Sequence, residues 1–161
     1  MSKVLLAKDA AEKALAIELD RTGSLLRSAW MFAAGNLVAL GFQLRDLKAL
    51  VESPSPLVKL LGCLSLAVLG ASLLLACQGV QARGYSQYPR GQKLWDSLKP
   101  ESVSAEAAEE AIVQMLLQTR EQNARLNDVK TRILGWCAGL FATGSLLVAG
   151  SQVLDAFESW T

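Results

Sequence analysis

The chain has 161 residues, enough for one domain, and its 16 basic and 15 acidic side chains leave a net charge of +1. That balance argues against nucleic acid as a bulk electrostatic partner, and none is expected. Apolar residues make up 52% of the chain and the mean hydropathy is +0.28. The excess is concentrated in three stretches, which favours a membrane protein over the alternative of a soluble helical bundle.

The first segment, residues 1–27, is predicted to be an amphipathic helix from Lys3 onward. Its apolar residues recur at steps of three, four or seven, which keeps them on one helical face. They are Val4, Ala7, Ala11, Leu15, Leu19 and Leu26. The segment has neither the apolar core nor the cleavage site of a signal peptide, so the first span is expected to direct insertion and to remain in the mature protein.

Three apolar stretches follow, at Ser28–Leu44, Leu57–Cys77 and Ile133–Leu154. A bilayer core about 30 Å thick needs about 20 apolar residues in a helix. The second and third stretches have that length, and the leucines at 25–26 extend the first. The prediction is an all-α membrane protein with three transmembrane helices.

The link between the first two spans is predicted to be a tight hairpin within the domain 28–79. Arg45–Glu52 has the pattern of a short amphipathic turn or helix, and Ser53–Pro56 then interrupts it. Because proline fits the first turn of a helix, Pro56 is expected to begin the second span.

Beyond the second span, residues 80–103 are rich in glycine, proline and polar side chains and are predicted to be a loop with a short helix at Gln92–Leu98. A helix is expected over residues 104–132, beginning at Ser104. Since nothing interrupts the pattern before Leu154, we expect this helix to continue into the third span, within the last domain, 133–161.

The distribution of lysine and arginine predicts the topology. Five lie before the first span and eight between the second and third, whereas the hairpin has three and the C-terminal tail none. The N-terminus and the long middle segment are therefore expected in the cytoplasm, with the hairpin and C-terminus outside.

Four polar residues lie where helices are expected to pack. Asn123, Asn127 and Lys130 share one helical face, and Asn36 lies near the middle of the first span. Two interpretations fit these three residues: they fix the register of helix packing, or they form a polar junction with a pore or ligand site. Asn36 is predicted either to hydrogen bond between helices or to line a pore.

Small residues mark the third span, with Gly135 and Gly139 in a GxxxG motif and Gly144 following. Such residues let helix backbones approach closely in lipid. The pattern fits packing within one chain or a homo-oligomer interface, and we take these glycines as candidates for the interface.

The loop carries a candidate ligand-binding group of two tyrosines and two arginines: Arg83, Tyr85, Tyr88 and Arg90. Aromatic and basic side chains of this kind gather at lipid headgroups. The alternative is that they stack on a nucleotide base and bind its phosphate.

No catalytic or metal-binding pattern is visible. The chain has no histidine, no Ser-His-Asp set and no phosphate-binding loop, and its cysteines have no metal-ligand spacing. Cys63, Cys77 and Cys137 are expected to be buried thiols that act as small apolar side chains. The chain is therefore expected to be neither an enzyme nor a holder of a cofactor or metal.

The run QTREQNARLNDVKTRILGWCAGLFATGSLLV, Gln118–Val148, resembles the junction in small bacterial membrane effectors, where a helix carrying Asn and Lys runs into a last span. Two earlier spans and the turn Tyr88-Pro89 extend this likeness to the Pycsar transmembrane effector group and related effectors of antiphage operons. The resemblance implies impairment of the bacterial inner membrane after a cyclic nucleotide signal.

The expected function is therefore that of an oligomeric inner-membrane effector, with the lipid bilayer, further copies of the chain and a cyclic nucleotide as partners. The alternative is a non-catalytic membrane scaffold, accessory subunit or immunity subunit.

Overall fold

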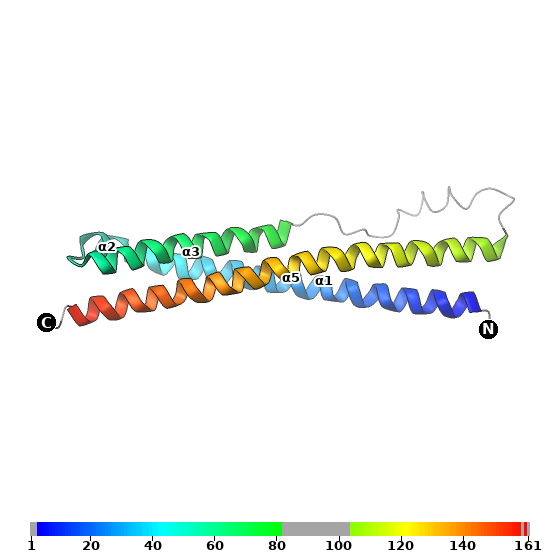
Figure 1. Cartoon of the computed structure of the whole chain (residues 1–161), viewed down its shortest axis with the longest axis horizontal. Coiled ribbons are helices and arrows are strands. Elements are labelled where there is room, and N and C mark those ends of the chain that lie inside the picture. The colour runs from blue at the N-terminus through cyan, green and yellow to red at the C-terminus, as the bar shows by residue number, and fades with distance from the viewer. Residues whose placement is uncertain (1–2, 82–103, 159, 161) are drawn as a thin grey trace. The chain divides into compact units, whose positions relative to one another are not determined.

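A computed structural model describes residues 3–81, 104–158 and 160, and in these residues the regular secondary structure is helical (Figure 1). The helices are α1 (Lys3–Arg45), α2 (Leu47–Glu52), α3 (Pro56–Gln81) and α5 (Ala105–Glu158). Three of them, α1, α3 and α5, are long and apolar enough to cross a membrane. This agrees with the three predicted spans and indicates a membrane protein. The short helix predicted at Gln92–Leu98 lies outside the described residues.

Local sequence signals set the helix ends where they were predicted. The Ser104 hydroxyl accepts a hydrogen bond from the Ala107 backbone N–H at 3.2 Å, as an N-cap residue does. From there α5 continues without a break past Leu154, so the predicted continuous helix is confirmed. Pro56 begins α3, and the first backbone bond of that helix runs from Lys59 N–H to the Ser55 carbonyl at 3.2 Å.

Leu50 of the short helix α2 packs against α3 at Gly62. A Cβ on Gly62 would collide with the Leu50 side chain, so the glycine leaves the space that Leu50 occupies. The hairpin predicted between the first two spans is therefore a packed element that joins α1 to α3.

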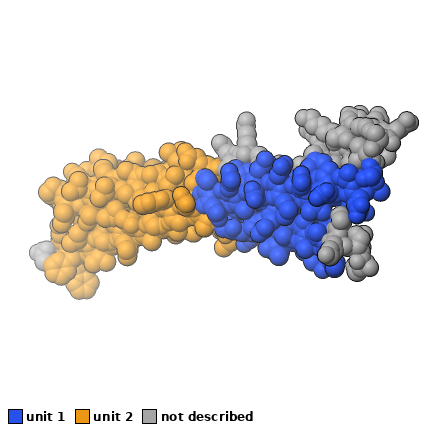
Figure 2. Space-filling model, turned by 45° about the vertical axis from the view of Figure 1, so that its right-hand side comes forward, with its two compact units in different colours: residues 1–25, 83–129 blue, residues 26–82, 130–161 orange. Residues whose placement is uncertain are grey.

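The chain divides into two compact units, which Figure 2 shows in different colours. Unit 1 comprises residues 1–25 and 83–129, and unit 2 comprises residues 26–82 and 130–161. Helices α1 and α5 contribute to both units, whereas the whole of α2 and α3 lies in unit 2.

Unit 1 is a pair of helical segments with a small apolar core. Ala11 and Leu15 of α1 pack with Leu116 of α5, and Ile112 packs against them. Further along both helices Thr22 contacts Asn127, so the two segments run parallel.

The predicted apolar face of residues 3–27 is only partly correct. Ala11 and Leu15 are buried as expected, but Ala7 and Leu19 are exposed, Leu19 by 43%. After Leu15 the next buried residue of this face is Thr22, because Thr22 and Glu18 contact the side chain of Asn127 on α5.

Unit 2 is a three-helix bundle. Asn36 of α1 is hydrogen-bonded to Ser72 of α3, and Gln43, further along α1, is hydrogen-bonded to Ser65, which comes earlier in α3. These two helices are therefore antiparallel. The buried positions of α3 repeat at steps of four and three, the spacing of left-handed helix packing. They are Val58, Gly62, Ser65, Leu69, Ser72, Ala76 and Gly79. Most are small, which lets the neighbouring backbones approach closely.

The polarity of unit 2 is the reverse of that in a water-soluble bundle. Asn36, Ser65 and Ser72 are fully buried, whereas Trp30, Leu60 and Trp136 are each 60% or more exposed. Lipid solvates such apolar side chains, and polar groups find their partners inside. The side chains of Trp30 and Trp136 are thus open to lipid, as is that of Trp160, and tryptophan is a residue enriched at membrane interfaces.

Candidate functional site

The predicted polar stripe on α5 is buried along its whole length. Asn123 and Asn127 are 0% exposed and belong to unit 1, while Lys130 is 3% exposed and belongs to unit 2. The spacing of four and three therefore predicted correctly that the three share the packed face of the helix. The two asparagines nevertheless differ in their hydrogen bonds.

Asn127 is the centre of a polar cluster in unit 1. Its Nδ2 donates to the Glu18 backbone carbonyl at 3.1 Å and to Glu18 Oε2 at 3.0 Å. The Thr22 Oγ1 lies 2.9 Å from both Asn127 Oδ1 and the Glu18 carbonyl, so its single proton serves one of them. The bond to the carboxylate is charge-assisted, the stronger class of hydrogen bond. This cluster joins α1 to α5 at one defined register.

An ion pair borders this cluster on the surface. Arg21 Nη2 lies 3.0 Å from Asp128 Oδ1, and Arg21 Nη1 lies 3.8 Å from Glu18 Oε2. The Arg21 and Asp128 side chains are 41% and 61% exposed, so water screens their attraction. The pair reinforces the same register at small energetic gain.

Asn123 has the same burial as Asn127 but a different hydrogen-bonding environment. Neither its Oδ1 nor its Nδ2 is hydrogen-bonded to any described residue. A buried polar group left unpaired costs about 1–3 kcal/mol. The two asparagines, four residues apart on one face, therefore contribute to the stability of unit 1 with opposite signs.

A second polar network joins the three helices of unit 2. Asn36 Nδ2 donates to the Phe32 carbonyl at 2.8 Å and to Ser72 Oγ at 3.0 Å. Ser72 Oγ donates in turn to the Cys137 carbonyl at 2.9 Å, and Cys137 Sγ donates to the Ser72 carbonyl at 3.3 Å. Asn36 thus makes the interhelical hydrogen bond that was one of its two predicted roles, although its Oδ1 is buried without a partner among the described residues.

The cysteines do not share one environment. Cys137 is buried in the bundle, as expected, but Cys63 and Cys77 are exposed. Both lie on the surface of unit 2 rather than in its core. The expectation that all three are buried is wrong for these two.

The three candidate interface glycines, Gly135, Gly139 and Gly144, differ in the space around them. A Cβ on Gly144 would lie 2.7 Å from Leu69 Cγ, so this glycine gives close contact between α5 and α3 within one chain. A Cβ on Gly135 or Gly139 would meet no atom within 4 Å. These two glycines are open on the surface of unit 2 and stay candidates for contact with another copy.

The candidate ligand-binding loop residues Arg83, Tyr85, Tyr88 and Arg90 lie outside the described residues. In the described part of the chain there is no group of three or more histidine, cysteine, aspartate or glutamate side chains placed to hold a metal ion.

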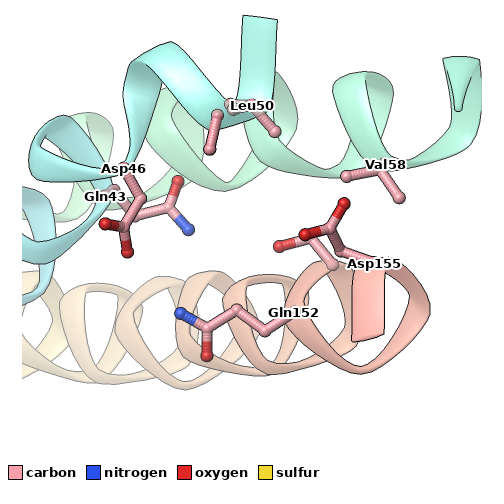
Figure 3. Close-up of a pocket in the computed structure, with 8 residues that line it drawn as sticks. Gln43, Asp46, Leu50, Val58, Gln152 and Asp155 are labelled. Atoms are coloured by element: carbon pink, nitrogen blue, oxygen red, sulfur yellow. The ribbon is translucent and has the colours of Figure 1, made fainter. Parts of the chain in front are cut away.

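A pocket of about 160 Å³ opens at the hairpin end of unit 2, and the sequence reasoning missed it (Figure 3). Its lining is Gln43, Asp46, Ala49, Leu50, Val58, Ser151, Gln152 and Asp155. Figure 3 shows the side chains of Gln43, Asp46, Gln152 and Asp155 gathered around the opening. The residues come from the ends of α1 and α5, from Asp46 between α1 and α2, from α2 and from the start of α3, so no local motif could have revealed them.

No protein-family model, no curated protein and no solved structure matches this chain. The functional argument therefore depends on the geometry described above.

Proposed function

We propose that the chain is an oligomeric effector of the bacterial inner membrane, which impairs the integrity of that membrane when triggered from the cytoplasm. The observation that carries the proposal is the reversed polarity of unit 2, with polar networks inside and large apolar side chains outside. In this proposal unit 2 is embedded in lipid with three spans, while the N-terminus and unit 1 are cytoplasmic. The C-terminus and the hairpin lie outside.

Signal transfer in this proposal depends on the two shared helices. Helices α1 and α5 each supply residues to both units, and the Asn127 cluster fixes how they pair in unit 1. A ligand that favours a different pairing would change what these helices present to unit 2. To move a two-state equilibrium from 1:99 to 99:1, a ligand needs about 5.5 kcal/mol of differential binding. Several equivalent sites in an oligomer supply that more readily than one contact in a single chain.

The proposed trigger is a cyclic nucleotide, and the proposed output is a pore or depolarisation formed between chains. Unit 2 supports an inter-chain arrangement because its own core is filled by small side chains and because Gly135 and Gly139 are open for contact. The chain is proposed to work by assembly, without catalysis.

A second candidate function is a non-catalytic scaffold, accessory subunit or immunity subunit. The observation that favours it is the close packing of the bundle, in which Leu69 and Ala76 are both 0% exposed and Gly144 is matched to Leu69. Such a bundle suits a rigid structural element.

Proteoliposomes that hold a potassium diffusion potential distinguish these functions. The purified full chain would be reconstituted and exposed on both faces to the 3′,5′-cyclic mononucleotides of adenosine, cytidine, guanosine and uridine, while a voltage-sensitive dye reports the potential. The effector proposal expects at least one nucleotide to collapse the potential. If the potential persists with all four nucleotides and at several protein densities, the effector proposal fails and the scaffold is favoured.

Helix continuity gives a variant for the same assay. A Gly-Gly insertion after Arg132 lies within α5. Each glycine lowers the stability of the helix by about 1 kcal/mol relative to alanine. The two extra residues also rotate the part of α5 after the insertion relative to the part before it. It should preserve insertion and assembly but abolish the triggered response. The control is a Gly-Gly insertion after Ser53, which lies between α2 and α3 and should leave the response unchanged. A response that survives the first insertion would refute transmission along α5.

A further inference from the structure

A groove of about 310 Å³ opens on the surface of unit 2, where α1 lies against α5. Its lining is Ser28, Met31, Phe32 and Gly35 of α1 together with Phe141 of α5. Gly35 keeps the groove open, because it has no side chain and a Cβ there would already touch Phe141 Cζ at 3.5 Å. The rings of Phe32 and Phe141 meet edge to face, with their centroids 6.4 Å apart. Apart from the Ser28 hydroxyl, the side chains that line the groove are therefore apolar.

The groove begins beside a positive charge. Arg27 directly precedes Ser28 and lies one helical turn before Met31, so Arg27 and Met31 are neighbours on the surface of α1. Arg27 is exposed and forms no ion pair or hydrogen bond with a described residue. Side chains of a helix lean toward its N-terminus, so the guanidinium extends away from the apolar span. An arginine at the start of a span thus has its charge at the level of the lipid headgroups and its stem along the apolar surface.

The other charges of unit 2 near this level are positive as well. A Cβ on Gly79 of α3 would lie 3.7 Å from both Ala29 and Leu134, so the three long helices meet at one level there. The charged residues of unit 2 that flank this level are Arg27, Lys130 and Arg132. The acids of unit 2 belong to the hairpin or to the last turn of α5: Asp46, Glu52, Asp155 and Glu158. Unit 2 therefore supplies no carboxylate as a counter-ion for Arg27.

This charge distribution decides between protein and lipid as the occupant of the groove. Copies of one chain insert into a membrane in the same orientation, so a second copy would bring its own positive end to the level of Arg27. Like charges repel, which disfavours that arrangement. A phosphate, by contrast, accepts paired hydrogen bonds from a guanidinium, and an acyl chain suits the apolar lining below it. A zwitterionic lipid also carries an ammonium, for which unit 2 has no acid at this level.

We propose that this groove binds one anionic phospholipid, with its phosphate at Arg27 and an acyl chain against Gly35 and Phe141. The groove has roughly ten times the volume of a water molecule in the liquid, about 30 Å³, so it takes a segment of one chain rather than a whole lipid. The site rests on the membrane location of unit 2 in the proposed function, and it needs neither the trigger nor the pore. A failed depolarisation assay would therefore leave this site standing, and failure of the site would leave the effector proposal standing.

Native mass spectrometry of the purified full chain in detergent tests the site. Phosphatidylglycerol and phosphatidylcholine with identical acyl chains would be added at equal concentration. The chain should retain phosphatidylglycerol in preference, saturating at one lipid per chain, because basic residues beside membrane spans attract anionic headgroups. Equal retention of the two lipids would overturn the proposal. Glycerol 3-phosphate, which has the charge without the chains, should not displace the lipid at the same concentration, and displacement would show that the groove takes no part.

Charge variants locate the headgroup. Arg27→Gln should weaken retention of phosphatidylglycerol by about ten- to a hundredfold, the fold-change of one charged hydrogen bond, and should leave phosphatidylcholine unchanged. The matched control is Arg132→Gln, which removes the same charge from an exposed side chain on α5 that does not line the groove. This control should keep the preference for phosphatidylglycerol. If both variants lose the preference equally, the lipid responds only to the net charge of unit 2 and the site is wrong.

Groove variants locate the acyl chain. Gly35→Leu fills the groove and should reduce retention of phosphatidylglycerol, whereas Gly41→Leu makes the same change on α1 where a Cβ meets nothing within 4 Å. Thermal unfolding followed by circular dichroism checks that each variant is folded. If Gly35→Leu does not fold, Gly35→Ala replaces it, since its Cβ has an ordinary contact distance of 3.5 Å to Phe141. Undiminished retention in the folded Gly35 variant would overturn the placement of the chain in the groove.

Discussion

The two buried asparagines of unit 1 give the sharpest test of the packing described above. Asn123 and Asn127 have the same residue type, burial and helix face, and they differ only in hydrogen bonding. The same substitution to alanine at each position therefore isolates the contribution of the hydrogen bonds. A model in which burial alone sets stability predicts equal effects.

For Asn127→Ala the change removes two hydrogen bonds donated to Glu18, one of them to its carboxylate. A hydrogen bond to a charged group contributes about 1.5–3 kcal/mol and a neutral one about 0.5–1.5 kcal/mol. The Glu18 side chain is 14% exposed and keeps Arg21 at 3.8 Å, so it retains some solvation. We expect a loss of about 2–3 kcal/mol in the free energy of opening unit 1.

For Asn123→Ala the change removes an amide whose two polar atoms have no hydrogen-bond partner among the described residues. The relief of about 1–3 kcal/mol offsets the lost packing, and alanine has the higher helix propensity. We expect no loss, or a gain of about 1 kcal/mol.

Amide hydrogen exchange in detergent measures both variants in the same segments, residues 10–25 and 110–129. A loss of 2–3 kcal/mol corresponds to exchange roughly 30- to 150-fold faster in Asn127→Ala. Exchange in Asn123→Ala should be unchanged or slower. The reasoning is refuted if Asn123→Ala accelerates exchange as much as Asn127→Ala does.

Three further predictions address the packing of unit 2, the assembly of the chain and its proposed orientation. Gly144→Ala places a Cβ 2.7 Å from Leu69 Cγ and should cost about 1–3 kcal/mol in unfolding in detergent, whereas Gly139→Ala meets nothing within 4 Å and should not destabilise the chain; equal losses would contradict the packing of α5 on α3. Gly139→Leu should instead weaken assembly of the chain, measured by its mass in detergent, and an unchanged oligomer would move the interface elsewhere. A reporter fused after Thr161 should be external and one inserted at Lys99 cytoplasmic, and the opposite result would overturn the proposed topology.

Much of the helical framework follows from local sequence signals. Ser104 predicted the start of α5 and Pro56 the start of α3, because capping and the fixed proline backbone act within one turn of helix. The stripe of Asn123 and Asn127 was predictable for a similar reason, since helical periodicity places residues on a face before any partner is known.

The partners across that face were not predictable in the same way. Glu18 and Thr22 lie more than a hundred residues from Asn127, and periodicity within one helix says nothing about the register of another. The error at Leu19 has the same origin. Apolar spacing alone placed it inside, but the polar pairing of Glu18 and Thr22 turns the packed face of α1 away from it.

The polar and small residues of unit 2 determine how its helices pack against one another. Lipid and a helix surface offer a leucine nearly the same environment, so an apolar contact scarcely distinguishes one register from another. Hydrogen bonds among Asn36, Ser72 and Cys137 do distinguish one register from another. A shift of one helix by a turn would separate these donors from their acceptors, and lipid offers no water to replace them. Gly144 adds a steric constraint, since a Cβ there would collide with the Leu69 side chain. The exposed leucines predict that a segment enters the membrane, whereas the polar and small residues determine which faces meet there.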